Sequence, residues 1–509
     1  MQTTNRVAIN TIIQYVKLVV NVLVGLISVR ILLNALGADD YGIYDVVGGI
    51  IAFLAFINSS LSQSSMRFLS VSLGKRDIYD TQRVFNDCFW IHLLVSVIIV
   101  FLFEILGPFL FDRFLVIPES RLSAAKIVYH FMIFILFLQI AITPFNALIV
   151  SHEKFVYTSA IAILDSFLKL GIAFVVKFSS TDKLIVYGGL MAGVTLLNSL
   201  LSILYIIKNY KQEVFLGKIS FRRSKELLSF VGWTVMDIIS QLSTRQGYAI
   251  MFNRFSGTAT NAVYALSRQI EGNLYYLSAS VIDSIKPQIM KSYGEGNMDR
   301  MIRLSLTAGK IGFSMLAVIA IPLMIMMPSV LELWLVNVPY GTIFFARMMV
   351  LACLIEQLTR GLVYSCQATG KIKLFSIIVS LIRFSALPLS IVAFICGCEA
   401  KVAMIIYVFC ESLGAFSRVL IMSKITELNV CNFISSVLFK IIPPVLVTAI
   451  VSFLLYQYNR EISFCVVNFM QAVLVYSCLS YLITLDSFEK TAINKVIKSS
   501  IAKFSRKRI

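Results

Sequence analysis

The stretch Leu184–Ile207, LIVYGGLMAGVTLLNSLLSILYII, contains 24 consecutive residues without a charged side chain. A run of about 20 apolar residues is long enough for an α-helix to cross the ~30 Å hydrocarbon core of a bilayer. Repeated runs of this kind predict a polytopic helical membrane protein, because outer-membrane barrels show short alternating strands instead. Three further uncharged runs have similar lengths: Val46–Met66, Ile311–Leu331 and Ile462–Leu485.

The composition supports this class and excludes others. Of the 509 residues, 58% are hydrophobic and only 14% are charged, whereas an ordinary soluble domain carries about 25% charged residues. A water-facing surface on a chain of this length needs far more charge, so soluble enzymes are excluded. The nine cysteines are an odd number and lie almost all in apolar spans, which predicts reduced packing residues rather than a disulfide scaffold.

Apolar runs between charged or turn-rich breaks predict an all-α polytopic membrane protein with about fourteen transmembrane helices. Several connections are short, and none leaves room for a folded domain outside the membrane. The expected spans run over residues 7–33, 41–62, 88–110, 124–148, 157–176, 184–207, 227–252, 261–283, 304–327, 341–368, 374–396, 401–422, 440–456 and 462–482.

The net charge of +18 is explained mainly by the loops. If the N-terminus is cytoplasmic, 27 of the 45 Lys and Arg residues fall on the cytoplasmic side, 7 on the opposite side and 11 inside spans. Because cytoplasmic loops of membrane proteins are enriched in basic residues, this split predicts that both termini are cytoplasmic. It gives no indication of a nucleic-acid partner.

The chain also carries an internal repeat, with one copy in each half. The segment Leu36–Tyr44, between the first two expected spans, corresponds in order and spacing to Ser256–Tyr264, between the seventh and eighth. Six spans separate the copies, so both have the same orientation. Parallel repeats of this kind are typical of transporters that bind substrate between the halves. We therefore expect two pseudo-symmetric six-helix lobes followed by two C-terminal helices.

The repeat sets the expected boundaries of the chain's parts. The N-terminal lobe, with spans one to six, covers residues 1–210, and a cytoplasmic linker covers 211–226. The C-terminal lobe, with spans seven to twelve, covers 227–422. The last two spans and a basic cytoplasmic tail cover 423–509.

Polar side chains form stripes along three of the expected spans. A charged group at mid-membrane costs roughly 2.5–3.5 kcal/mol, so such a face must meet water or protein polar groups. Intervals of three, four or seven residues place each stripe on one helix face. The stripes comprise Asn10, Gln14, Lys17, Asn21 and Ser28; Thr234, Asp237, Gln241, Arg245 and Tyr248; and Tyr264, Arg268, Glu271, Tyr275 and Ser278. We infer a hydrated cavity lined by spans one, seven and eight and, by symmetry, two; interhelical hydrogen bonding is the alternative.

The candidate site residues come mainly from these stripes. Arg30 joins them from a different face of the first span. Asp237 and Glu271 are candidate proton or sodium sites, since no ATP-binding motif is present. No metal site, cofactor or catalytic residue is expected, because the three His residues lack ligand spacing and no HExxH or GxSxG motif occurs. The expected substrate-binding residues are Lys17, Asn21, Arg30, Gln241, Arg245, Tyr264, Arg268 and Tyr275.

The remaining intramembrane charges are expected to have structural roles. Asp165 and Lys169 are four residues apart and predict a local ion pair, as do Glu356 and Arg360. A second group is expected to extend from its helices toward water at the helix ends. This group comprises Lys126, Arg383 and Arg418.

Several short motifs resemble a known family. The stretch Val29–Tyr44, VRILLNALGADDYGIY, resembles the junction of the first two spans in bacterial polysaccharide exporters of the O-antigen flippase (Wzx) type. These exporters belong to the MATE-like multidrug/oligosaccharidyl-lipid/polysaccharide (MOP) superfamily. The same family pattern is matched, in order, by Arg67–Leu69, Gly74–Asp77, Glu332–Leu335 and Ala368–Lys373.

The resemblance implies a V-shaped cavity and alternating access. It implies that an undecaprenyl-diphosphate-linked repeat unit is flipped from the cytoplasmic to the periplasmic leaflet of the inner membrane, for surface polysaccharide biosynthesis. Inner-membrane lipids, a polysaccharide polymerase and glycosyltransferases are the partners it implies. Cationic side chains would contact the diphosphate, namely Lys17, Arg245 and Arg268. Tyrosines would stack against sugars, namely Tyr248, Tyr264 and Tyr275.

Other functions remain as alternatives. A lipid-linked peptidoglycan-precursor flippase would carry a similar diphosphate lipid. A cation-coupled MATE-type exporter of small molecules should have a mainly acidic and apolar cavity, which the basic residues on the stripes disfavour. A membrane glycosyltransferase or polymerase would need a catalytic constellation and a large external loop, and neither is evident in the sequence.

Overall fold

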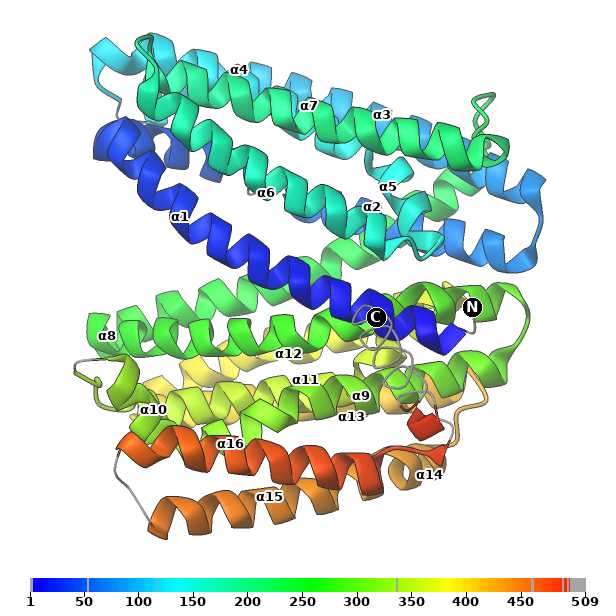
Figure 1. The fold of residues 1–509 in the computed structure, drawn as a ribbon, viewed down its shortest axis with the longest axis vertical. Helices are drawn as coiled ribbons and strands as arrows, with labels where there is room; N and C mark the ends of the chain where they lie inside the picture. Colours follow the sequence, from blue (N-terminus) through cyan, green and yellow to red (C-terminus); the bar gives the residue numbers. More distant parts are fainter. Residues whose placement is uncertain are drawn as a thin grey trace, which may run out of the picture. The chain divides into compact units, whose positions relative to one another are not determined.

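The computed structural model describes residues 3–52, 55–115, 117–335, 337–458, 462–487, 489–491 and 494, and every regular element within them is helical (Figure 1). The chain divides into two compact units, which we call the N-terminal unit (Ile12–Val235) and the C-terminal unit (Met236–Ile509 with Met1–Thr11). The expectation of an all-helical, multi-span membrane protein is confirmed.

The N-terminal unit is built mainly from seven helices, and the chain leaves it inside an eighth. One π-helical turn, Leu110–Phe114, extends α3, and a 3-10 turn, Lys211–Glu213, follows α7. The helices are α1 (Thr3–Ala52), α2 (Ala55–Lys75), α3 (Ile78–Phe109), α4 (Glu119–Ala141), α5 (Thr143–Ser151), α6 (Phe155–Phe178) and α7 (Lys183–Tyr210).

The C-terminal unit begins within α8 (Phe221–Gly294), which is the longest helix of the described residues. π-Helical turns follow α14 and α16, at Ile434–Leu438 and Ser480–Thr484. The other helices are α9 (Met298–Ile325), α10 (Met327–Trp334), α11 (Thr342–Thr369), α12 (Ile372–Ile395), α13 (Ala400–Ile425), α14 (Val430–Phe433), α15 (Phe439–Tyr458) and α16 (Ile462–Leu479).

Each of the fourteen expected spans coincides with helical chain where its residues are described. Eleven helices of the described part are long and apolar enough to cross a membrane. The expected spans 227–252 and 261–283 are helical but too polar to be among these eleven, and the expected span 41–62 is divided by residues 53–54, which lie outside the described part. The two polar spans are the seventh and eighth, which the sequence assigned to a hydrated cavity together with the first and second.

The repeat appears in the backbone at two glycines, one in each copy of the repeated segment. Gly37 interrupts α1 with φ 80° and ψ 169°, and Gly257 interrupts α8 with φ 83° and ψ 175°. This region of backbone conformation is accessible almost only to glycine. Each glycine therefore joins two helix arms without an intervening loop, and the two arms of α8 are Phe221–Ser256 and Thr258–Gly294.

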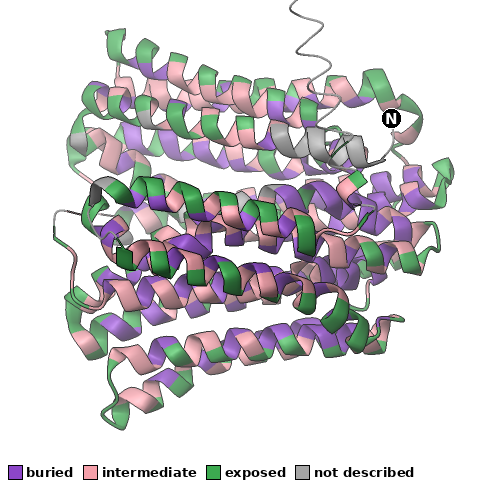
Figure 2. Cartoon of the chain, turned by 60° about the horizontal axis from the view of Figure 1, so that its bottom comes forward, coloured by how far each residue is buried: buried purple, intermediate pink, exposed green. Residues whose placement is uncertain are grey.

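Exposed faces of the helices are apolar, as a bilayer requires. Ile105, Ile250 and Ile395 are each at least 70% exposed. Figure 2 shows buried and exposed positions alternating around single helices rather than along them. In the C-terminal unit, α9 and α11 approach so closely that a Cβ on Gly309 would lie 2.7 Å from the Leu358 carbonyl oxygen, a contact that uses small residues as membrane helices commonly do.

The expected linker is bound to the N-terminal unit. The Asn86 side chain accepts a hydrogen bond from the Gly217 amide (2.6 Å), and Asp87 accepts one from the Ser220 amide (3.0 Å). The guanidinium of Arg223 lies 3.5 Å from the Asp87 carboxylate. The chain after α7 is thus fixed along the start of α3.

A second set of hydrogen bonds joins α1, α4 and the residue that caps α7, at the other end of the N-terminal unit. Arg121, at the start of α4, donates to both carboxylate oxygens of Asp40 (2.8 and 2.6 Å) and of Asp182 (3.1 and 2.6 Å). The hydrogen bonds from Arg121 lower the pKa of Asp182 below its ordinary value, although partial burial opposes this. Asp182 also caps α7 by accepting from the Leu184 amide.

The chain after α16 is held against α9 by ion pairs. The ammonium of Lys310, which is 2% exposed, lies 2.7 Å from Asp486 and 3.0 Å from Glu489. Lys440 from α15 also pairs with Asp486. Most of the basic tail predicted up to Arg508 lies outside the described residues.

The positive φ at Gly257 generates a test of the repeat. A Gly257→Ala variant should lose about 1–3 kcal/mol of stability, because alanine is strained in this backbone conformation although no atom lies within 4 Å of its Cβ. Thermal unfolding of the purified protein in detergent measures the effect. Gly272→Ala is the matched control, since Gly272 lies in the same helix with equally open space; equal melting temperatures for both variants would contradict the assignment.

Candidate functional site

The candidate site in the C-terminal unit consists of buried and partly buried charged side chains from four helices. We call this set the arginine–carboxylate network. It contains four arginines and four carboxylates, contributed by α8, α11, α12 and α13. Its members are Asp237, Arg245, Glu271, Glu356, Arg360, Arg383, Glu411 and Arg418.

Arg383 is the central cation of one part of this network. Its guanidinium donates to Asp237 at 2.7 Å and to Glu411 at 3.4 Å. Gln241 supports Asp237 by donating to its second carboxylate oxygen at 3.1 Å. The sequence therefore placed Asp237 and Gln241 together, but the cation that binds Asp237 comes from α12.

Arg418 is more deeply buried, with 2% of its surface exposed. It lies 4.0 Å from Glu411 and donates to the Thr359 hydroxyl at 3.1 Å. The expectation that Arg383 and Arg418 extend to the helix ends is wrong, because both are buried among partners from neighbouring helices. Lys126, the third residue of that group, is exposed.

The two arms of α8 meet at a smaller cluster. Arg245 on the first arm lies 3.5 Å from Glu271 on the second, and the Arg245 side chain is 34% exposed. Arg268, one turn before Glu271, is half-buried and close enough to Glu271 for their charges to interact. Two arginines thus lie beside one carboxylate on the stripe that the sequence singled out.

The tyrosines of these stripes serve packing in this structure. Tyr248 and Tyr264 are 0% and 2% exposed, and the Tyr264 hydroxyl donates to the Arg245 carbonyl at 3.1 Å. Their rings have no exposed face for a sugar. Tyr275 is half-buried, and its ring lies 4.7 Å from the Arg360 guanidinium. The predicted Glu356–Arg360 pair is confirmed at 2.8 Å.

The N-terminal unit carries a separate polar group on α1, α6 and α7. Asn21 accepts a hydrogen bond from the Ser166 hydroxyl at 2.9 Å. The predicted pair of Asp165 and Lys169 is confirmed at 2.7 Å, and Asn198 also donates to Asp165 at 2.8 Å.

The other candidates on α1 differ in exposure. Lys17 is half-buried, and Arg30 is exposed. Gln14 is 9% exposed. The side chain of Asn10 lies outside those that the structure describes. Among the described residues, no three His, Cys, Asp or Glu side chains are grouped to hold a metal ion.

Sequence reasoning missed Arg383, Glu411 and Arg418 as members of the site. One signal was available for Arg383, which lies at the middle of α12. At 1.5 Å per residue it is roughly 16 Å from either end, too far for a side chain to reach water. Arg418 lies in the second half of α13, nearer to a helix end, so only the packing of neighbouring helices decides the outcome there.

Comparison with known proteins agrees with this architecture. Residues 15–175 match the MatE family model. The fold is similar to the crystal structure of a point mutant of a MATE protein, with a TM-score of 0.71 at 15% identity over 82% of this chain and 95% of the other. The fold is that of MATE-type membrane transporters.

Two further solved structures share the fold. A MOP superfamily transporter from Pyrococcus furiosus Vc1, described as having a binding pocket of reverse polarity, gives a TM-score of 0.66 at 14% identity over 82% of this chain and 95% of its own. The MATE transporter ClbM, in complex with Rb⁺, gives 0.69 at 16% identity over 84% and 96%.

Among curated proteins, the chain is similar to the uncharacterized membrane protein EpsK of Bacillus subtilis strain 168. The two are 22% identical over 312 residues, and the match spans only 60% of each chain. The family model matches about a third of the chain, and the solved structures show that the fold is MATE-like.

Burial of the network generates a stability test. Glu411→Gln should lower stability by about 3–5 kcal/mol, because it leaves Arg418 buried without a carboxylate partner. Adding Arg418→Met should recover much of the loss, since replacing a whole buried pair is often neutral. Thermal unfolding in detergent reports both, with exposed Glu226→Gln as the control. A double variant less stable than Glu411→Gln alone would disprove the pairing.

Proposed function

We propose that this protein flips an undecaprenyl-diphosphate-linked oligosaccharide from the cytoplasmic to the periplasmic leaflet of a bacterial inner membrane, for surface polysaccharide biosynthesis. It would act by alternating access, with both termini in the cytoplasm. The sequence resemblance of Val29–Tyr44 to Wzx-type exporters supports this substrate class, and the fold supports the transport mechanism.

One observation carries the proposal. Arg245 and Arg268 lie beside Glu271 where the arms of α8 approach each other, and with Arg268 included the arginines of this region outnumber the carboxylates of the network by five to four. Both arginines are partly accessible. Guanidinium groups bind phosphate oxygens through paired, charge-assisted hydrogen bonds. A diphosphate would balance the surplus cation and compete with Glu271 for Arg245.

One solved structure with a similar fold supports the idea that the pocket can carry a different charge. The transporter from Pyrococcus furiosus is described as having a binding pocket of reverse polarity that suggests a different function. A pocket of changed polarity is therefore compatible with this fold. Lys17 and Asn21 of the N-terminal unit, with Arg30 seven residues before the Gly37 break in α1, remain the proposed contacts for the rest of the cargo.

Glu271 is the stronger of the two candidate ion-coupling residues. Its contact with Arg245 is 3.5 Å, whereas Asp237 is held by Arg383 at 2.7 Å and by Gln241 at 3.1 Å. A weakly paired carboxylate takes up a proton or Na⁺ more readily than one fixed by a short ion pair. A structure with this fold, the MATE transporter ClbM, holds the monovalent cation Rb⁺, which is consistent with a cation site in this protein.

Removing the surplus cation should impair transport without unfolding the protein. Arg245→Gln and Arg268→Gln should each lower the rate of flipping of a fluorescent polyprenyl-diphosphate oligosaccharide in proteoliposomes by about tenfold or more, since a charge-assisted hydrogen bond contributes about 1.5–3 kcal/mol. Complementation of a flippase-null strain, read as surface glycan, provides the cellular measurement.

Arg222→Gln is the matched control for these variants. It makes the same change at a 93% exposed position of the same helix, so flipping should be unaffected. Normal glycan from both Arg245→Gln and Arg268→Gln at normal expression would refute the cation site. If the protein instead rescues a peptidoglycan-precursor defect and not a surface-glycan defect, its substrate is the lipid-linked peptidoglycan precursor.

Coupling is tested separately at Glu271. Glu271→Gln should remove the dependence of flipping on an imposed H⁺ or Na⁺ gradient, because the glutamine amide cannot take up and release a proton and has no negative charge to bind Na⁺. Downhill exchange of the lipid should continue. Flipping rates are compared with and without each gradient. A variant that keeps the wild-type gradient dependence would exclude Glu271 as the coupling group.

A cation-coupled exporter of small molecules is the second candidate, favoured by the MATE structures that share the fold. It predicts that expression raises the resistance of a drug-sensitive strain and leaves the flippase-null strain unrescued. The two functions therefore give opposite outcomes in the same pair of strains.

A further inference from the structure

The linker between α7 and α8 carries an exposed apolar surface. Its backbone is bound to α3, because the amides of Gly217 and Ser220 donate to Asn86 and Asp87. Phe221, the first residue of α8, is 85% exposed. Exposed clusters of large apolar side chains mark interaction surfaces. We call the cluster here the linker patch, and its members are Phe215, Leu216, Ile219 and Phe221.

The hydrogen bonds to α3 fix the depth of the linker in the membrane. Asp87 and Asp112 are 25 residues apart on α3 and its π-helical extension, which corresponds to roughly 38 Å at 1.5 Å per residue. The hydrocarbon core is ~30 Å thick, and the headgroup layers bring the bilayer to ~40–45 Å. The two aspartates therefore lie in opposite headgroup layers, and the linker amide bound to Asp87 lies in one of them.

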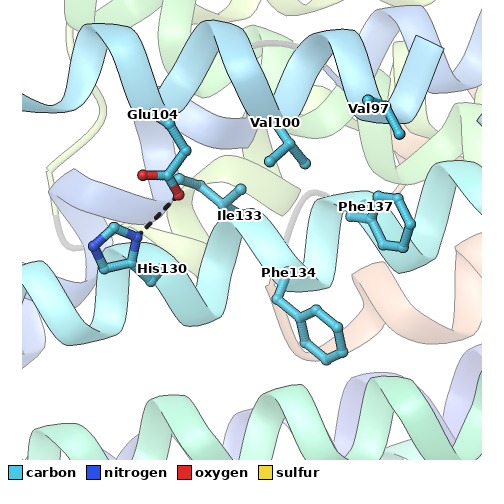
Figure 3. Close-up of a pocket in the computed structure, with 7 residues that line it drawn as sticks. All are labelled: Val97, Val100, Glu104, His130, Ile133, Phe134 and Phe137. Atoms are coloured by element: carbon cyan, nitrogen blue, oxygen red, sulfur yellow. Dashed lines mark hydrogen bonds and ion pairs between the residues drawn. The ribbon is translucent and has the colours of Figure 1, made fainter. Parts of the chain in front are cut away.

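The chain between the two aspartates agrees with this placement. It belongs to a 36-residue helical stretch that is apolar enough to cross a membrane. Glu104 is the one acidic residue between them, and Figure 3 shows it facing His130 of α4, with 3.0 Å between Oε1 and Nδ1. Trp90, one turn after Asp87, is of a residue type that is enriched at membrane–water interfaces.

Two lysines beside the linker patch have no acidic partner. Lys218 lies within the linker and Lys225 in the first turns of α8, and both are exposed. Neither forms an ion pair with a residue in the described part of the chain. The acidic side chains of this region are bound to other residues, in the pairs Glu213–His152, Asp87–Arg223 and Glu226–Arg222.

We propose that the linker patch lies in the headgroup layer of the nearer leaflet and binds anionic phospholipid there. The four apolar side chains enter the boundary of the acyl chains, as the apolar face of an interfacial segment does. Lys218 and Lys225 bind the phosphates of the headgroups. This inference concerns the surrounding membrane and is independent of the transported cargo.

Depth and charge together favour phospholipid over a protein partner. A protein would have to displace headgroups to reach side chains at the depth of Asp87, whereas phospholipid is already present there. The linker patch offers an apolar surface next to two unpaired cations. An anionic phospholipid matches both, because its acyl chains contact the apolar side chains and its phosphate contacts the lysines.

The depth is tested with full-length protein that carries the photo-crosslinker p-benzoylphenylalanine in place of Phe221. After illumination in vesicles of equal phosphatidylcholine and phosphatidylglycerol, intact-protein mass spectrometry should show phospholipid adducts. The same crosslinker in place of Tyr79 is the matched control and should give far fewer adducts. Tyr79 is an exposed aromatic residue eight positions before Asp87, and thus roughly 12 Å farther from the bilayer.

The role of charge is tested by the ratio of phosphatidylglycerol to phosphatidylcholine adducts at the Phe221 crosslinker. Lys218→Gln and Lys225→Gln should each lower this ratio about fivefold, because a basic residue near an anionic membrane surface contributes ~1 kcal/mol. Lys177→Gln is the control and should leave the ratio unchanged, since it makes the same substitution at an exposed lysine in the last turn of α6.

Three results would overturn the proposal. The first is a crosslinker at Phe221 that gives no more lipid adduct than the one at Tyr79. The second is crosslinking of Phe221 to this chain or to a second copy, which would assign the linker patch to a protein contact. The third is an adduct ratio that stays at the wild-type value in both lysine variants, which would remove the role of anionic lipid.

Discussion

The absence of water in the hydrocarbon core determines how this chain places its charges. A charged side chain there must find a protein partner or reach an interface. The C-terminal unit meets this demand with alternating arginines and carboxylates from four helices, so that Arg383 binds both Asp237 and Glu411. Such a network fixes the relative positions of α8, α12 and α13, because movement of any one of them separates buried opposite charges.

The same demand explains why the two expected spans in α8, 227–252 and 261–283, are more polar than the eleven apolar helices of the described part. Helices that carry Asp237, Arg245 and Glu271 exchange favourable lipid contact for polar contact inside the protein. Their polarity gives the unit groups that can respond to an anionic cargo or to a cation. In the N-terminal unit, the charge of Asp165 is instead balanced locally by Lys169, and Asn198 donates a hydrogen bond to the same carboxylate.

Much of the fold could be predicted from the sequence because apolar run length and the internal repeat are local or periodic signals. The matching φ values at Gly37 and Gly257 bear this out. The candidate site was harder to predict from the sequence. Stripes on α8 identified Asp237 and Glu271, but the cation that binds Asp237 comes from α12, far along the chain. Only tertiary packing determines such pairs, and it also buried Tyr264, which periodicity alone had assigned to a wet face.

The attachment of Gly217 and Ser220 to Asn86 and Asp87 has a mechanical consequence. The chain crosses between the compact units twice, inside α1 between Thr11 and Ile12 and inside α8 between Val235 and Met236, and the segment before α8 is already bound. The first arm of α8 is therefore anchored at its start and helical through the crossing, so movement at this connection has to appear as torsion or bending of that helix.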